Sequence, residues 1–168
     1  MTNAFPSFPD EASLWVYATE RPLTANEQAL VLDHLNRFFS GWASHGRPVR
    51  GAAQFLHDRF LLVAGHLEEG TISGCGTDAC LDQVRTALEH VGTTWVSSLT
   101  IFYRDADGHL YGVSRPAFRR LIREGRVDAS TPVFDLSLTT VGDLRAGRFE
   151  RPAGQSWHAT VFHLALPA

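Results

Sequence analysis

The residues best suited to do chemistry lie in one stretch, Ser73-Gly74-Cys75-Gly76-Thr77-Asp78-Ala79-Cys80. This stretch places a cysteine in a glycine-rich turn just before a predicted helix. Amide dipoles at the start of a helix favour negative charge, so a thiol at this position loses its proton more easily. The chemistry predicted for Cys75 is thiolate attack on an electrophile. Amides near Ser73, Gly74 and Gly76 would bind the developing negative charge.

Each cysteine also has a structural interpretation. Cys75 fits a small buried residue in a tight turn, because free cysteines are often buried. Cys80 falls near the inward face of the helix, where we expect a core role, and its spacing from Cys75 is not Cys-x-x-Cys. Two cysteines with scattered histidines do not make a zinc signature, so we expect no metal and no cofactor.

Two residues are candidate catalytic partners of the Cys75 thiol. Asp78 falls in the first turn of the predicted helix, where its carboxylate either complements the helix dipole or acts as a general base. His158 would complete a Cys–His pair if the fold brought it to Cys75. Nothing in the sequence shows that the two meet, and a structural hydrogen bond is the alternative for this histidine.

Further binding candidates pair aromatic with basic residues. Trp42 and His45 lie at a predicted helix end, and Trp157 precedes His158. Arg119 and Arg123 share one face of a predicted helix, where they would form a surface for phosphate or an acidic peptide. A solvated helix face is the alternative for these arginines.

The basic residues exclude several functions. All 15 are arginine, and the chain has no lysine. Schiff-base chemistry and a lysine general base are therefore excluded, and so is a Walker A loop, which needs Gly-Lys-Ser/Thr. No Gly-x-Gly-x-x-Gly opens a helix, so a Rossmann nucleotide site has no support. A formal net charge of −3 argues against a dedicated nucleic-acid binder.

Composition predicts a cytoplasmic protein. The chain is 44% hydrophobic and 20% charged, which suits a soluble domain with a real core. No apolar run approaches the roughly 18 residues of a membrane-spanning helix. Residues 1–11 carry no secretion-signal pattern, and two cysteines suit a reducing compartment.

The first part of the chain predicts alternating strands and helices. Thr24-Ala25-Asn26-Glu27 is a capping box that begins a long helix. After an irregular segment over 1–12, the expected elements are a strand at 14–18, a helix to about Ser44, strands at 51–57 and 60–67, a helix at 77–90 and a strand at 99–104. This order is βαββαβ, which predicts a ferredoxin-like core over residues 13–104 with both helices on one face of an antiparallel sheet.

The remaining residues, 105–168, predict a hairpin-helix-strand extension packed on the core. Asp105-Ala106-Asp107-Gly108 is a hairpin turn signal, and Ser114 caps a helix with Pro116 in its first turn. We then expect a strand at 131–136, one helical turn at 141–145 and a last strand at 157–164. The predicted fold class is α+β, in one compact unit overall.

Several of these stretches together resemble a family of small bacterial proteins of uncharacterised function, often labelled "ABC transporter ATPase". The resemblance covers most of the chain and rests on Trp15-Val16-Tyr17, Gly41-Trp42-Ala43-Ser44-His45-Gly46, Asp58-Arg59-Phe60, Ser73-Gly74-Cys75 with Asp78, and Ser156-Trp157-His158 followed by Phe162. In the family pattern Ser-Ile follows the cysteine, where this chain has Gly76-Thr77, and a serine stands in place of Cys80. The resemblance implies no known activity, and the missing Walker lysine contradicts the ATPase label.

The extension alone is similar to a GYF-type adaptor module. The similarity rests on Gly108-His109-Leu110-Tyr111-Gly112, on the helix Phe118 to Val127, and on Thr131-Pro132-Val133-Phe134. Members of that fold bind proline-rich peptides on exposed aromatic residues. Here Gly112-Val113-Ser114 stands where the family has Gly-Pro-Phe, which puts peptide binding in doubt.

Two functional hypotheses follow. The favoured one is a non-catalytic cytoplasmic binding or assembly protein that contacts a protein partner, because no complete catalytic set lies in one stretch. The alternative is a small thiol-dependent enzyme or redox-sensitive protein that uses Cys75, with a small molecule as its ligand. A homo-oligomer is compatible with both, and neither nucleic acid nor a membrane is an expected partner.

Overall fold

The computed structural model describes residues 4–164 and divides into two compact units. Unit 1 contains the residues up to Val96 together with Ser137–Arg145, and unit 2 contains Ser97–Leu136 with the residues from Ala146 onward. The break between the units follows Val96, whereas the sequence predicts a boundary after residue 104. Each unit has its own hydrophobic core.

The sheet of unit 1 contains β1 (Ser13–Ala18), β4 (Arg50–Leu56) and β5 (Phe60–His66). These strands lie in the order β1-β5-β4 and pair antiparallel throughout. The predicted hairpin joins β4 to β5, and its turn residues His57 and Asp58 both have positive φ. All residues of β5 except the last are buried, because this strand is central in the sheet.

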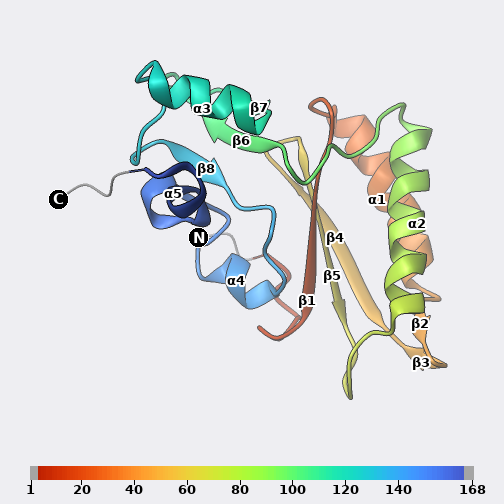
Figure 1. Cartoon of the computed structure of the whole chain (residues 1–168). Coiled ribbons are helices and arrows are strands. Elements are labelled where there is room, and N and C mark those ends of the chain that lie inside the picture. The colour runs from red at the N-terminus through yellow and green to blue at the C-terminus, as the bar shows by residue number, and fades with distance from the viewer. Residues whose placement is uncertain (1–3, 165–168) are drawn as a thin grey trace. The chain divides into compact units, whose positions relative to one another are not determined.

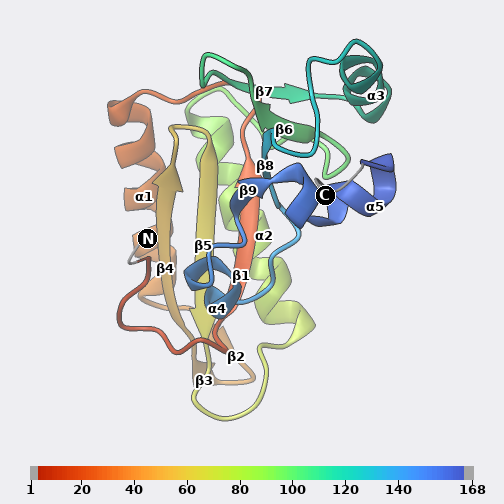
Figure 2. The ribbon, with the colours of Figure 1, turned by 90° about the vertical axis from the view of Figure 1, so that its left-hand side faces the viewer.

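The helices of unit 1 are α1 (Ala25–Phe39), α2 (Gly74–His90) and α4 (Val141–Arg145). Figures 1 and 2 show α1 and α2 on one face of the β1-β5-β4 sheet and α4 on the other face. The core between α1, α2 and β5 is apolar, and its fully buried members include Val31, Leu35, Leu61, Val63, Val84 and Leu88. Val31 and Leu35 lie four residues apart on α1, as do Val84 and Leu88 on α2, so each pair shares one face of its helix.

The predicted capping box at the start of α1 is present. The Thr24 hydroxyl accepts the backbone N–H of Glu27, and the Glu27 carboxylate accepts that of Thr24. Arg21 also donates to this carboxylate, and that hydrogen bond, with the Thr24 amide, lowers the pKa of Glu27 to about 2. The helix nevertheless ends at Phe39, five residues before the predicted end, because β2 (Ala43–Ser44) and β3 (Arg47–Pro48) form a short hairpin.

The strand predicted to complete the first sheet belongs to the other unit. Residues 99–104 are predicted as the fourth strand of the ferredoxin-like core, but β6 (Ile101–Arg104) pairs with strands of unit 2. At the two ends of β1 there are isolated antiparallel bridges instead, between Ser13 and Thr140 and between Thr19 and Trp95. A turn from Ser97 to Thr100 follows Trp95. The α+β class is confirmed, whereas residues 4–164 do not form a complete four-stranded ferredoxin-like sheet in unit 1.

Residues 137–145 return to unit 1 and pair with the start of β1 and with the segment just before it. Leu14 donates its backbone N–H to Thr139, and Val141 donates to Ala12. The predicted helical turn at 141–145 is α4. The irregular segment predicted over 1–12 is confirmed for residues 4–12, which form turns and bends, and residues 1–3 lie outside the described range.

The sheet of unit 2 contains β6, β7 (Leu110–Val113), β8 (Pro132–Phe134) and β9 (Glu150–Pro152) in the order β7-β6-β8-β9. Its helices are α3 (Arg115–Arg123), the 3-10 turn η1 (Ala153–Gln155) and α5 (Trp157–Phe162). Ser114 caps α3 and proline stands in its first turn, as predicted. Helices α3 and α5 are in contact through the rings of Phe118 and Phe162, whose centres lie 4.8 Å apart.

The last predicted strand is wrong, because residues 157–162 form helix α5. Aromatic and β-branched residues favour a strand here, but the Ser156 hydroxyl caps a helix by accepting the N–H of His158. His163 then ends the helix in the left-handed conformation, with φ of 53°. The part of the extension beyond Leu164 lies outside the described residues. No helix within residues 4–164 is long and apolar enough to cross a membrane.

Candidate functional site

Two of the stretches singled out in the sequence meet at the start of α2. Ser73 caps the helix with its hydroxyl and donates its own N–H to the Ser44 hydroxyl at 2.8 Å. The indole Nε1 of Trp42 donates to the carbonyl of Gly76 at 2.9 Å. Trp42 and Gly76 are buried, so these bonds fix the helix start to the β2–β3 hairpin.

The same bonds limit what the helix start can bind. The N–H of Gly76 donates to the Ser73 hydroxyl, and the N–H of Ser73 is held by Ser44. Two of the three amides expected to bind a developing oxyanion are therefore already satisfied within the protein, and Gly74 is the one that keeps a free amide at the first helical position. We call this set of contacts at the start of α2 the structural joint, because it fixes the helix to the β2–β3 hairpin.

Cys75 lies inside the helix, not in a loop before it. Because α2 begins at Gly74, Cys75 is its second residue, and its side chain is exposed. Asp78 is the fifth residue, beyond the first turn where it was expected, and is also exposed. The predicted complementarity between Asp78 and the helix dipole is therefore weak, since that effect falls off after one turn.

The second thiol has the core role that the sequence predicts. Cys80 is 2% exposed, and burial raises its pKa to about 12. Both cysteines are free. His45, in contrast, does not lie at a helix end as expected: it is exposed in the turn of the β2–β3 hairpin, with φ of 49°.

We predict that iodoacetamide labels Cys75 in the folded protein and labels Cys80 only after unfolding, because the Cys80 thiol is buried and protonated. Mass spectrometry of the labelled peptides in native buffer and in urea measures this directly. The variants Cys75→Ser and Cys80→Ser assign the two sites. Labelling of Cys80 in native buffer, or protection of Cys75, would contradict the arrangement of α2.

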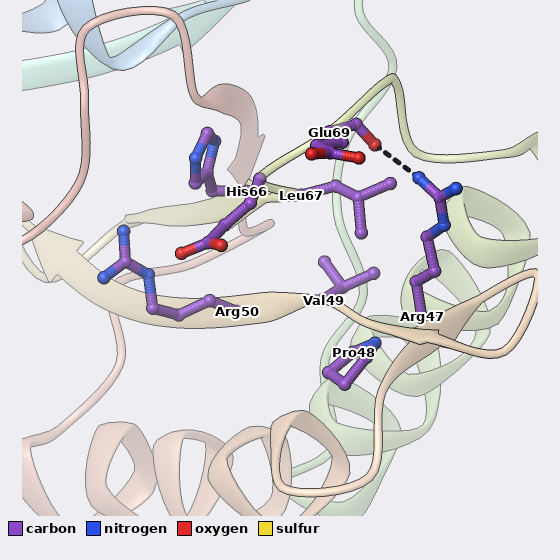
Figure 3. Close-up of a pocket in the computed structure, with 8 residues that line it drawn as sticks. Arg47, Pro48, Val49, Arg50, His66, Leu67 and Glu69 are labelled. Carbon is purple, nitrogen blue, oxygen red and sulfur yellow. Dashed lines mark hydrogen bonds between the residues drawn. The ribbon is translucent and has the colours of Figure 1, made fainter.

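A cleft in unit 1 lies beside this joint (Figure 3). It has a volume of about 490 Å³ and is lined by Arg47, Pro48, Val49 and Arg50 on one side and by His66, Leu67, Glu68 and Glu69 on the other. Arg47 donates to the backbone carbonyl of Glu69 at 3.1 Å, and the Arg50 guanidinium lies 4.7 Å from the centre of the Phe8 ring. Both arginines thus have partners within unit 1.

The cleft has the size of a small-molecule site. None of its eight lining residues is a serine, threonine or cysteine. Its charges are mixed, with arginine, histidine and glutamate side chains around an apolar floor (Figure 3). The sequence analysis missed this cleft because its residues come from the ends of different strands and match no motif.

In unit 2, His158 is the most buried polar residue. Its imidazole is 0% exposed and stacks on the Trp157 ring at 3.9 Å. Its Nδ1 lies 2.6 Å from the Ser156 hydroxyl. The indole Nε1 of Trp157 donates to the buried Asp135 carboxylate at 3.1 Å. The predicted aromatic–histidine pair is therefore part of the core of unit 2.

The predicted Cys75–His158 pair gains no support from these contacts. Cys75 belongs to unit 1 and His158 to unit 2, and the ring and hydrogen-bond partners given for His158 all belong to unit 2. The pKa of His158 is lowered to about 4, chiefly by burial. The Asp135 charge opposes this shift, and smaller effects of the Arg151 and Arg115 charges add to it. The imidazole is neutral at pH 7.

We predict that this histidine makes the protein less stable in acid. An unfolded histidine binds a proton near pH 6.5, and His158 binds one only near pH 4, so between these values the unfolded state holds more protons. Stability therefore falls as the pH decreases, by about 2 kcal/mol for this group between pH 7.5 and pH 5. Urea unfolding at both pH values measures it.

The matched variants are His158→Asn and His163→Asn, because His163 is exposed at the end of the same helix. The acid-induced loss of stability should shrink in His158→Asn and persist in His163→Asn. Equal losses in both variants and the native chain would show that His158 titrates normally.

The predicted arginine face of α3 is exposed. Arg119, Arg120 and Arg123 are all exposed, and the Arg119 guanidinium lies 5.2 Å from the centre of the Phe162 ring. Next to the start of α3 is a hollow of about 380 Å³. It is lined by Ser97, Leu99, Thr100, Ser114, Arg115 and Pro116. Leu99 is 58% exposed there, and Tyr111 on β7 is 45% exposed.

One group of metal-ligating residue types lies in the β6–β7 turn. Donor atoms of Asp105, Asp107 and His109 fall within 4.8 Å of one another. The Asp105 carboxylate accepts the backbone N–H groups of Asp107 and His109 at 2.9 Å each, which is the bonding of an Asx turn. The turn itself accounts for this cluster.

No protein-family description, curated protein or solved structure matches this chain. The two resemblances stated from the sequence therefore stay predictions.

Proposed function

We propose that this protein is a binding protein and that unit 2 holds a segment of a protein partner. The observation that carries the proposal is the hollow beside α3, where an exposed leucine, a proline and an arginine lie together. Leu99 is 58% exposed beside this hollow, and burial of its side chain by a partner would stabilise a complex.

The hollow offers two kinds of contact. Leu99 and Pro116 provide apolar surface, whereas the hydroxyls of Ser97, Thr100 and Ser114 provide hydrogen-bond donors and acceptors. Sites that bind a protein segment usually combine apolar and polar surface in this way.

Charge indicates that the segment is acidic. Unit 2 contains eight arginines and six carboxylates, whereas unit 1 contains seven arginines and twelve carboxylates. The exposed Arg119, Arg120 and Arg123 follow the hollow along α3, and Arg115 lines the hollow itself. A segment with an apolar side chain flanked by aspartate or glutamate would match both features.

The thiol-dependent alternative has less support. Cys75 is exposed on α2 without a hydrogen-bond partner among the contacts described for it, and Asp78 is exposed beyond the first turn. The histidine expected to act as a base is fully buried among the aromatic rings of unit 2. A thiol enzyme needs a base within hydrogen-bond reach, and none of the predicted residues supplies one to Cys75.

Selection from a displayed library of random 12-residue peptides against the full chain tests the proposal. We expect enrichment of sequences in which acidic residues flank an apolar one. A selected peptide should bind Leu99→Ser about tenfold more weakly, because the variant loses most of one leucine's buried apolar contact.

The chain supplies a matched control for that variant. Leu30 on α1 is 54% exposed, so Leu30→Ser changes the same side chain at similar exposure in unit 1. We expect Leu30→Ser to bind the selected peptide as tightly as the native chain. The proposal fails if no peptide is enriched, or if both leucine variants bind equally well.

A further inference from the structure

Unit 2 contains three covered nitrogen atoms that have no hydrogen-bond partner. They are Nε of Arg115, Nε of Arg151 and Nε2 of His158. A buried polar atom without a partner costs about 1–3 kcal/mol, and folded proteins satisfy nearly all such atoms with protein groups, water or a ligand. The three atoms among the described residues of unit 2 are therefore candidate contacts for water or for a bound group.

The three side chains belong to one cluster. The Arg115 guanidinium lies 5.7 Å from the centre of the Trp157 ring, and that ring stacks on His158 at 3.9 Å. Arg151 on β9 comes directly before η1 and α5, and its charge and that of Arg115 both act on the His158 imidazole. The groups come from α3, β9 and α5, so the fold of unit 2 assembles them.

The two arginines are cations without a counter-ion. Within the described residues, neither Arg115 nor Arg151 forms an ion pair or a side-chain hydrogen bond. The carboxylate that faces the cluster belongs to Asp135, which accepts the indole N–H of Trp157. Both arginines are half-buried, and the Nε atom of each guanidinium is covered.

The neutral imidazole can act as a third donor. The Ser156 hydroxyl lies 2.6 Å from Nδ1 of His158 and 3.2 Å from the carbonyl of Ala153. We assign the hydroxyl proton to the shorter contact, and the ring proton is then on Nε2. His158 would thus present an N–H without needing a positive charge.

We propose that Arg115, Arg151 and His158 form a binding site for an oxyanion, either a phosphate or a carboxylate group. Guanidinium groups bind both through paired, charge-assisted hydrogen bonds. A bound oxyanion would supply the missing counter-charge for two arginines and a partner for the covered nitrogens. This site goes beyond the proposed binding of a protein segment and does not depend on it.

Thermal unfolding of the full chain at pH 7 tests the site with inorganic phosphate, acetate and chloride at equal ionic strength. We expect phosphate or acetate to raise Tm by several degrees more than chloride, with saturation as the concentration increases. The anion that produces the increment identifies the class of oxyanion. No increment over chloride from either anion would overturn the proposal.

Two variants separate this site from a general salt effect. Arg151→Gln should lose the increment, whereas Arg123→Gln, on the exposed face of α3, should keep it. Arg151 is used because Arg115 also lines the hollow proposed for the protein segment. An increment of the same size in Arg151→Gln would contradict the assignment.

The native chain provides a second measurement that needs no variant. In a phosphate or acetate titration followed by NMR, the ring nitrogens of His158 should shift with the same saturation curve as Tm, and those of the exposed His163 should not. If Tm rises while the His158 signals stay unchanged, the anion binds elsewhere and the proposal is wrong.

Discussion

The guanidinium of Arg145 binds residues 137–145 to the N-terminal segment of unit 1. The chain leaves unit 2 and returns to it on either side of these residues, so its division into two units depends on them. The guanidinium donates to the carbonyls of Phe5 and Phe8 at 2.6 Å each and pairs with Asp10 at 2.7 Å. Charge-assisted bonds of this kind are the stronger hydrogen bonds in proteins, and this side chain is only 27% exposed. Residues 137–145 stay in unit 1 through these contacts, although β8 before them and β9 after them pair with each other in unit 2.

That path divides the chemistry of the molecule between two units. In unit 1, α1 and α2 cover one face of the sheet. Trp42, Ser44 and Ser73 fix the start of α2 through hydrogen bonds, so their role is structural. Unit 2 contains the exposed apolar side chain of Leu99 beside α3. It also contains two arginines and a histidine that each have one covered nitrogen atom without a hydrogen-bond partner. These groups could gain contacts from a ligand, and on this basis we propose that the binding function lies in unit 2.

Sequence reasoning succeeded where the signal was local. The capping box at Thr24, the cap at Ser114 and the hairpin at 57–59 follow from neighbouring residues, and the structure contains them. Sequence reasoning failed where contacts between residues far apart in the chain determine the structure. The strand expected at 99–104 exists, but which sheet it joins depends on pairing with β7 and β8. The site shows the same limit: the sequence indicates His158 as part of an aromatic–histidine pair, whereas Arg151 carries no sequence signal. Arg151 enters the proposal because its charge acts on that histidine in the folded chain.

The central claim is that ligands of this protein bind to unit 2. A chemical-shift map of the full, isotope-labelled chain with an acidic peptide obtained by selection tests it most directly. The account predicts that the amide signals that move belong to Leu99, Thr100 and the first turn of α3, while those from Ser73 to Asp78 stay in place. Shifts of amide signals confined to the start of α2, or to the cleft between Arg47 and Glu69, would contradict the account and show that the peptide binds to unit 1.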